Sequence, residues 1–327
     1  MNLNGKIKIP LRRYTKEELL TMQEDKQVPI VEGILYENDY VLLVSKPKVG
    51  KSILALQLAS SISSGKDFLG TFHIPKPQRV WYFATEGKDE DIKDRLARIK
   101  QLVEIDPDNF VLFCSAGFRF NTDIGKEAIK YLTQEYKNEL PKVIIIDALY
   151  LAVKGSLKDD DVINEFNYII RGFAEYCDAS IIIVHHTKKP TMIEGHLVES
   201  NLKMDDVFGS IFLPASADHI FHFDMDSKTK LRHLVCESQR SGEVIENMTL
   251  ILQEPSPLGF IPIPTEPEQI NPIEEYLKLN PQGLTIKELM KKTNFSRENI
   301  YRVLKQLKDK VEKTKERPVK YIVCKDA

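Results

Sequence analysis

The residues best suited to chemistry form a polar run that ends in Gly-Lys-Ser. An apolar stretch, 41–44, precedes this run, and a helix-like stretch, 53–64, follows it. Strand, polar loop and helix in this order are the layout of a phosphate-binding loop. Backbone N–H groups of such a loop surround phosphate oxygens, and the start of the helix adds free donors and positive charge. The loop residues are Ser45, Lys46, Pro47, Lys48, Val49, Gly50, Lys51 and Ser52.

Two residues of this loop have specific tasks in nucleotide binding. Lys51 would reach the β- and γ-phosphates of ATP, and the Ser52 hydroxyl would bind Mg²⁺. Ser45 stands where the pattern G-x-x-x-x-G-K-[ST] has its first glycine. Because serine enters left-handed backbone space only at a cost, we expect the loop entrance to differ in shape. The alternative is a chance Gly-Lys-Ser in a surface loop.

Two acidic residues follow other apolar strands. Asp147 ends the run 143–146, and it suits a metal ligand because buried carboxylates are costly unless they are paired or metal-bound. Ala148 follows it, so the residue that positions water is not its neighbour, and Glu86, after the strand 80–84, is the better candidate. The alternatives are a helix N-cap for Asp147 and a solvent-exposed loop acid for Glu86.

Two histidines end the next predicted strand, 180–184. Neighbouring residues of a strand face opposite sides, so we expect one of His185 and His186 to touch the γ-phosphate and the other to pack inward. A hydrogen-bonded core histidine is the alternative for either. Two other pairs, His219-x-x-His222 and His233-x-x-Cys236, have zinc-like spacing, but residues i and i+3 of a strand diverge, so we predict no metal site there.

The pattern along the chain predicts an α/β fold. Apolar strands and helices alternate from 41 to 184, which indicates a mainly parallel sheet with both faces covered. Strands without long helices follow over 220–252, and a cluster of prolines marks a linker. The predicted parts are an N-terminal segment, 1–27, an α/β domain, 28–255, a linker, 256–270, and a C-terminal domain, 271–327.

The C-terminal part has the pattern of a winged helix-turn-helix. The pattern consists of a helix over 273–279, a capping box at Thr285 to Glu288, a helix over 297–310 and a two-stranded wing over 311–324. From 269 to 327 the net charge is +6, against −8 for the rest of the chain, which favours a polyanionic partner. The alternative is a module that contacts protein. Expected DNA contacts on its third helix are Arg297, Tyr301, Arg302 and Lys305.

Composition excludes several classes of protein. The chain of 327 residues is 42% hydrophobic and 29% charged. These shares are typical of soluble globular proteins. We expect no membrane span, because no run of about 18 apolar residues occurs. The start of the chain lacks the apolar core of a signal peptide, and its four cysteines are scattered, so we expect a cytoplasmic protein with reduced thiols.

The ordered motifs together resemble the RecA-like ATPases of the plasmid RepA kind, which are relatives of hexameric replicative helicases. The likeness covers about residues 28–253. The motifs are Ser45–Ser52, Tyr82–Glu86, Ile144–Asp147, Val184–Lys189, Gly209-Ser210 and Ala217-Asp218. The resemblance implies a RecA-like core, hydrolysis of ATP between the subunits of a homo-oligomeric, hexameric ring, and movement on single-stranded DNA.

The resemblance also implies roles for particular residues. Glu86 matches the catalytic glutamate, Asp147 the metal-side aspartate and His186 the γ-phosphate sensor. Arg240 matches a basic position that reaches the ATP of the neighbouring subunit, although Ser238 stands where many relatives have lysine; the alternative for Arg240 is an exposed edge-strand arginine. The long polar loop 187–206, which carries Lys188 and Lys189, is expected to face DNA.

Three functions are compatible with these residues. The first is a Mg²⁺-dependent ATPase that acts as a ring-forming DNA helicase or replication ATPase of a mobile element. The second is an ATP-switched oligomeric regulator that binds duplex DNA through the winged helix. The third is a scaffold that binds nucleotide without cleaving it, and the presence of both Glu86 and Asp147 argues against that one.

Overall fold

The computed structural model divides the chain into two compact units, Met1–Ile263 and Pro264–Ala327. It describes residues 13–21, 27–115, 117–188, 191–193, 196–198, 206–239 and 245–263 of the first unit. In the second unit it describes parts of 273–323. Each unit has a hydrophobic core of its own.

A nine-stranded sheet forms the centre of the first unit, in the order β13-β12-β11-β10-β3-β7-β6-β4-β5. Six neighbouring strands are parallel, and three antiparallel strands extend the sheet beyond β10. The parallel strands are β10 (His219–Met225), β3 (Tyr40–Ser45), β7 (Ser180–His186), β6 (Val143–Asp147), β4 (Val80–Ala84) and β5 (Phe110–Cys114). The antiparallel strands are β11 (Arg232–Gln239), β12 (Met248–Gln253) and β13 (Gly259–Ile263). The predicted α/β fold with a mainly parallel sheet is confirmed.

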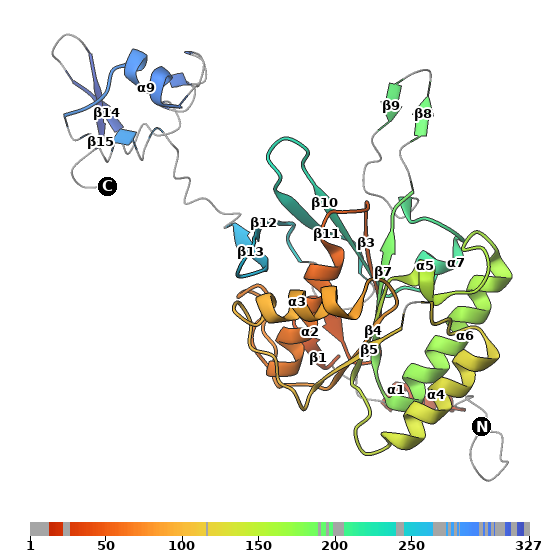
Figure 1. The fold of residues 1–327 in the computed structure, drawn as a ribbon. Helices are drawn as coiled ribbons and strands as arrows, with labels where there is room; N and C mark the ends of the chain where they lie inside the picture. Colours follow the sequence, from red (N-terminus) through yellow and green to blue (C-terminus); the bar gives the residue numbers. More distant parts are fainter. Residues whose placement is uncertain are drawn as a thin grey trace. The chain divides into compact units, whose positions relative to one another are not determined.

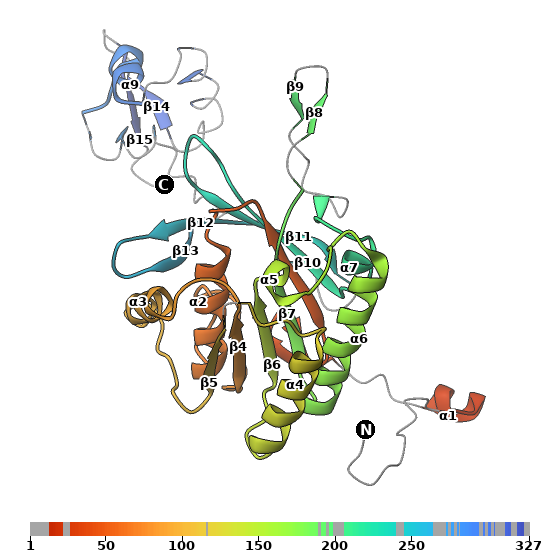
Figure 2. The same cartoon turned by 45° about the vertical axis from the view of Figure 1, so that its right-hand side comes forward.

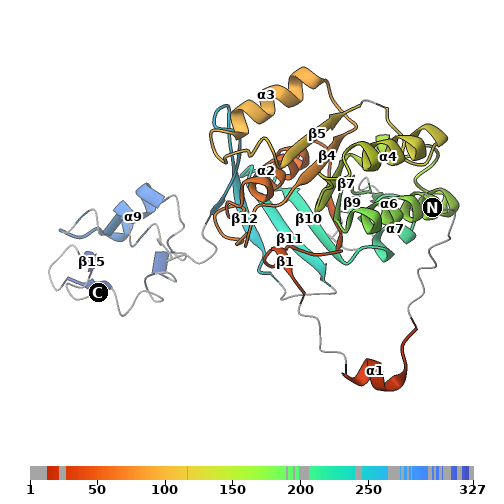
Figure 3. The ribbon, with the colours of Figure 1, turned by 90° about the horizontal axis from the view of Figure 1, so that it is seen from below.

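Helices cover both faces of this sheet (Figures 1 and 2). Helices α2 (Lys51–Ser64) and α3 (Asp89–Ile99) lie on one face. Helices α4 (Asp123–Glu135), α5 (Leu149–Ala152), α6 (Asp160–Cys177) and α7 (Phe212–Ala215) lie on the other, as the view from below also shows (Figure 3). Alternate residues of β3 enter the two cores, which explains why the central strands read as unbroken apolar runs.

Small elements complete the first unit. Helix α1 (Lys16–Thr21) begins at a capping box, in which the Glu18 backbone N–H donates to the Thr15 hydroxyl at 3.2 Å. Strands β1 (Pro29–Val31) and β2 (Leu35–Tyr36) pair with each other. The predicted polar loop 187–206 contains a hairpin, β8 (Thr191–Ile193) and β9 (His196–Val198), which projects beyond the carboxyl end of β7 (Figure 1).

The first unit ends later than the proline pattern predicts. Residues 256–270 were expected to be a linker, but β13 occupies Gly259–Ile263 and the boundary between the units follows Ile263. Pro262 fits into β13 because this strand is the outermost of the sheet, where a missing N–H breaks no ladder on the open side.

The second unit is built around helix α9 (Ile286–Thr293) and a two-stranded antiparallel sheet, β14 (Val311–Lys313) with β15 (Tyr321–Val323). The predicted capping box is present, because the Thr285 N–H donates to the Glu288 carboxylate at 2.8 Å and the Glu288 N–H donates to the Thr285 hydroxyl at 3.3 Å. Ile273, Leu289 and Ile300 belong to its core. In the parts of both units that the structure describes, no helix has the length and apolar character needed to cross a membrane.

Candidate nucleotide-binding site

The carboxyl ends of four neighbouring parallel strands lie at one edge of the sheet. Strand pairing sets Ser45 of β3 opposite His186 of β7, and Asp147 of β6 opposite Ala84 of β4. Ligand sites in open α/β sheets occur at such an edge. The register therefore brings the phosphate-binding loop, both acidic residues and His186 to the same edge.

The ammonium group of Lys51 is buried among acceptors of its own loop and of His186. Its Nζ lies 3.1 Å from Ser45 Oγ, 3.1 Å from the Lys46 carbonyl oxygen and 3.2 Å from His186 Nδ1. Burial lowers the pKa of Lys51 to about 8, while the carboxylates of Asp147 and Glu86 act in the opposite direction. A buried cation held only by neutral acceptors suits a site that receives an anion.

Ser45 is not among the left-handed residues of the loop. It is the last residue of β3, and its hydroxyl donates to the Lys46 carbonyl at 2.7 Å. The left-handed residues of the loop are Lys48, with φ of 65°, and Gly50, with φ of 109°. The loop adopts left-handed backbone three residues after Ser45, and the serine hydroxyl supplies an acceptor to Lys51.

Strand β10 and the antiparallel strands beyond it hold the loop from outside. Lys46 pairs with Asp224 of β10 at 3.4 Å, and Arg232 Nε donates to the Val49 carbonyl at 3.4 Å. Gln57 of α2 makes two hydrogen bonds with the backbone of Phe260, at 2.9 and 2.7 Å. These strands therefore fix the position of the loop and of α2.

Gly50 is the position of the loop where substitution should cost most stability. An added Cβ would lie 2.8 Å from Phe260 Cζ, and φ of 109° strains any other residue. We expect Gly50→Ala to lower the free energy of unfolding by about 2–3 kcal/mol in urea titrations. Gly172→Ala on α6, where a Cβ meets nothing within 4 Å, should stabilise by up to about 1 kcal/mol. Equal stabilities of the two variants would contradict this description of the loop.

The side-chain oxygens of Asp147 and Ser52 are neighbours, and both are of the kind that bind metal ions. Asp147 is buried and accepts hydrogen bonds from the Tyr82 hydroxyl, at 2.7 Å, and from Ser52. Burial raises the pKa of Asp147, the two hydrogen bonds oppose that rise, Glu86 adds to it and Lys51 opposes it. Because Mg²⁺ takes one or two protein oxygens and completes its shell with phosphate and water, this pair fits the ion.

The two histidines of β7 have separate environments. His186 is half-buried beside Lys51, and burial together with the Lys51 charge lowers its pKa, against the effect of Glu86. His185 is fully buried, its Nε2 donates to the Phe208 carbonyl at 2.6 Å, and burial lowers its pKa to about 4. One histidine therefore lies at the site and the other packs inward, as the strand alternation predicts.

Glu86 is exposed just beyond the end of β4. The preceding residue, Thr85, fixes this end, because its N–H donates to the Asp147 carbonyl and its hydroxyl to the Ala148 carbonyl, both at 2.8 Å. The Tyr150 hydroxyl hydrogen-bonds the Glu86 carboxylate. Sequence reasoning missed Tyr150, although its place three residues after Asp147 puts it at the same strand end.

The other predicted residues belong to the loop after β7, to the second unit, or to parts of the chain that the structure does not describe. The structure does not describe Arg240, Lys189, Arg302 or Lys305. Lys188 is exposed, and its backbone N–H donates to the Asp206 carbonyl at 2.6 Å. In the second unit the guanidinium of Arg297 lies 5.8 Å from the ring centre of Tyr301.

The two histidines of the first zinc-like pair face carboxylates. His219 faces Asp39 at 2.9 Å, and His222 faces Glu237. Within the described ranges no group of three or more His, Cys, Asp or Glu side chains could hold a metal ion.

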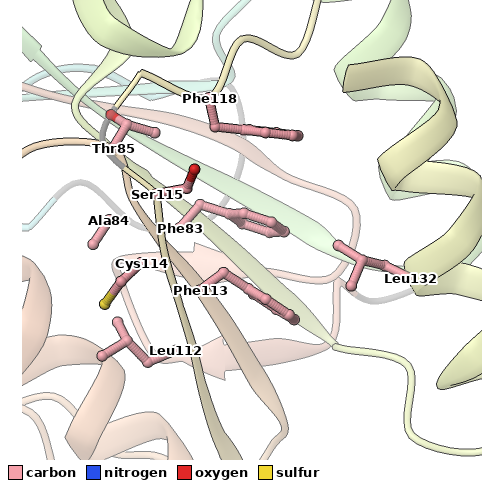
Figure 4. Close-up of a pocket in the computed structure, with 9 residues that line it drawn as sticks. All are labelled: Phe83, Ala84, Thr85, Leu112, Phe113, Cys114, Ser115, Phe118 and Leu132. Atoms are coloured by element: carbon pink, nitrogen blue, oxygen red, sulfur yellow. The ribbon is translucent and has the colours of Figure 1, made fainter. Parts of the chain in front are cut away.

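A pocket of about 310 Å³ lies along the ends of β4 and β5 (Figure 4). Aromatic and aliphatic side chains line most of it, among them Phe83, Phe113 and Leu132 of α4. Thr85 lines it too, so this pocket borders the residue that fixes Glu86 but shares no side chain with the phosphate-binding loop.

A solved structure of another protein shares the fold of the first unit. A DnaB-like replicative helicase, whose structure was solved together with its interactions with primase, superimposes with a TM-score of 0.55 at 16% identity, over 75% of this chain and 66% of the helicase. The matching region thus spans just under two thirds of that helicase. A KaiC-like protein from Pyrococcus horikoshii OT3 aligns at 15% identity with a TM-score of 0.46, over 72% of this chain and 94% of that protein.

No curated protein matches the sequence. The family model described as an AAA domain matches residues 10–192, which is more than half of the chain. That range includes the phosphate-binding loop, Glu86, Asp147 and His186. The protein therefore belongs to this AAA-domain family and is a P-loop ATPase with a RecA-like fold.

Proposed function

We propose that this protein hydrolyses ATP with Mg²⁺ at the carboxyl edge of its sheet, as a ring-forming DNA helicase or replication ATPase of a mobile element. The observation that supports the hydrolytic part most is the grouping of four side chains at the ends of adjacent strands and at the start of α2. Lys51, with His186 at 3.2 Å, provides the cation, and Asp147 and Glu86 provide two acids in different environments.

Each of these groups has one task in the proposal. Lys51 leaves its loop acceptors and binds β- and γ-phosphate oxygens. Ser52 and Asp147 hold Mg²⁺, which when bound neutralises charge on the phosphates. Glu86 orients a water molecule and accepts its proton, and neutral His186 offers a hydrogen bond on the γ-phosphate side. The contacts of Lys46 and Val49 with β10 and β11 keep the loop in place before the nucleotide arrives.

The motor part of the proposal involves neighbouring subunits and DNA. Arg240 reaches the ATP of the adjacent subunit in a hexameric ring, and Lys188 and Lys189 contact a single strand of DNA. The support is the sequence resemblance to RepA-like ATPases and the shared fold with a protein described as a replicative helicase.

Strand displacement on forked DNA by the full-length chain tests this function. We expect unwinding that requires ATP and Mg²⁺ and that is absent in Lys51→Ala. ATP hydrolysis by the intact oligomer without any unwinding would reject the motor and leave the ATPase.

An ATP-switched regulator is a second candidate, because the second unit has its own core and carries Arg297 and Tyr301, whereas the nucleotide site belongs to the first unit. In that case the oligomer would turn ATP over slowly and bind one duplex sequence more tightly with ATP than with ADP. Competition between specific and random duplexes, with each nucleotide present, separates the two functions.

In either function we expect the second unit to contact the phosphate backbone through Arg297. Arg297→Ala should weaken duplex binding about three- to tenfold near 0.1 M salt and reduce the slope of log affinity against log salt by about 1. Fluorescence anisotropy at four salt concentrations measures both quantities. Lys287→Ala removes an equal charge from the exposed side of α9 and is the control. Identical effects of the two substitutions would show that Arg297 has no particular contact.

A further inference from the structure

Tyr150 lies between two side chains that have different tasks in the proposed reaction. Its hydroxyl hydrogen-bonds Glu86, and its ring centre lies 5.4 Å from that of His186, with the rings inclined by 54°. We propose that Tyr150 is a positioning residue that holds Glu86 in place and links it to His186. This inference rests on the proposed ATPase function and concerns how the same site is controlled.

The backbone on both sides of this contact is fixed. Thr85, which precedes Glu86, donates two hydrogen bonds to the segment 147–148, and α5 with Tyr150 begins directly after that segment. The Tyr150 side chain itself is 39% exposed, so it is not a core residue on which folding depends. A partly exposed side chain that bonds a carboxylate and covers a histidine is better explained by a task at the site.

The Tyr150 hydroxyl is protonated at neutral pH and so can act as a constant hydrogen-bond donor. Burial and the Glu86 carboxylate raise the pKa of Tyr150, so the hydroxyl keeps its proton at neutral pH. When the Tyr150 hydroxyl donates to one carboxylate oxygen of Glu86, it restricts the motion of the Glu86 side chain and leaves the other carboxylate oxygen for a water molecule. Because His186 also faces Lys51 Nζ at 3.2 Å, contacts run without a break from Glu86 to the cation that binds phosphate. A displacement of His186 on nucleotide binding would therefore also shift Tyr150 and, through it, the Glu86 side chain.

The kinetic test compares two substitutions of Tyr150 in the full-length chain. Tyr150→Phe keeps the ring against His186 and removes the hydroxyl, so we expect kcat for ATP to fall about five- to tenfold with KM changed by less than about twofold. Tyr150→Ala also uncovers His186, and we expect a larger loss of kcat together with a raised KM. Tyr168→Phe on α6, at an 82% exposed position, is the control. An unchanged kcat in Tyr150→Phe would overturn the proposal.

The link to Glu86 has two tests of its own. Tyr150→Phe added to Glu86→Gln should change turnover by less than about twofold, because the two residues act through one contact. A further five- to tenfold loss there would show that Tyr150 acts independently of Glu86 and would overturn the proposal.

The second test needs no turnover and so stands apart from the proposed function. With ¹³C-labelled tyrosine, NMR titration should show a lower pKa for Tyr150 in Glu86→Gln than in the wild type, because the carboxylate that raises it is gone. An unchanged Tyr150 titration would exclude the contact. A wild type without ATPase activity that still shows this shift would reject the proposed function while the contact holds.

Discussion

Lys51→Met should lower ATP turnover about 10²- to 10³-fold, and at pH 7 it should make the nucleotide-free protein more stable than the wild type. The loss of turnover follows because the ammonium group is the buried cation of the loop, directed at neutral acceptors. Methionine keeps the apolar stem of the side chain without its charge. Phosphate release and urea unfolding of the same preparations measure the two effects.

The gain in stability depends on pH, with a sign that follows from the pKa of Lys51. Burial lowers this pKa to about 8 in the folded chain, from an ordinary value of 10.5, so the folded state holds the charged form at a cost below pH 8. Between about pH 8 and 10.5 the folded chain has lost the proton that the unfolded chain keeps, so the wild type gains stability as pH rises. The advantage of Lys51→Met should therefore shrink from pH 7 to pH 9.

Lys66→Met, at an exposed position just beyond α2, is the matched control and should change neither quantity. A Lys51→Met protein that retains wild-type turnover would remove the phosphate-binding role from this loop. An advantage in stability that grows with pH would show that the ammonium group is not buried in the folded chain.

Glu86→Gln should lower kcat for ATP about 10²- to 10⁴-fold while the affinity for ATP stays within about threefold. Glutamine keeps the shape of the side chain and its hydrogen-bond acceptor but cannot accept the proton of an attacking water molecule. Single-turnover hydrolysis and equilibrium binding of a fluorescent ATP analogue separate the two effects.

The control for Glu86→Gln is Glu90→Gln, an exposed acid in the first turn of α3. It should leave both quantities within about twofold of the wild type. If Glu86→Gln kept a kcat within threefold of the wild type, the proton acceptor would have to be another residue.

Local pattern was sufficient to predict the parallel half of the fold. The strands ending at Ser45, Ala84 and Asp147 are buried on both faces, so each reads as an apolar run with a polar residue at or just beyond its carboxyl end. The loop, the helix after it and the split between His185 and His186 follow from spacing and strand alternation alone. The family match, which ends at residue 192, covers these same elements.

The contacts that hold the loop in place could not be predicted in this way. Asp224 and Arg232 reach the loop across 178 and 183 residues of chain, and Gln57 meets Phe260 across 203. No local period encodes such pairings. Pro262 made β13 read as part of a linker, because proline is tolerated in an outermost strand for reasons that only the sheet order reveals.

Two details of the site were missed because they depend on side-chain geometry. The left-handed turn of the loop falls at Lys48 and Gly50, and the Ser45 hydroxyl contacts Lys51, which the sequence pattern did not indicate. Tyr150 belongs to no motif and reads in sequence as one aromatic residue of a short helix. Its importance is visible only once Glu86 and His186 lie beside it.

The central claim is that Lys51, Ser52 and Asp147 receive the phosphates and the metal ion of Mg²⁺–ATP at this sheet edge. A crystal structure of the full-length chain with Mg²⁺ and a non-hydrolysable ATP analogue tests it most directly. We predict that Lys51 Nζ exchanges its contacts with Ser45 and Lys46 for β- and γ-phosphate oxygens, with the metal ion on Ser52 and the γ-phosphate beside Glu86. A nucleotide bound elsewhere, or one bound while Lys51 keeps both loop contacts, would contradict this account.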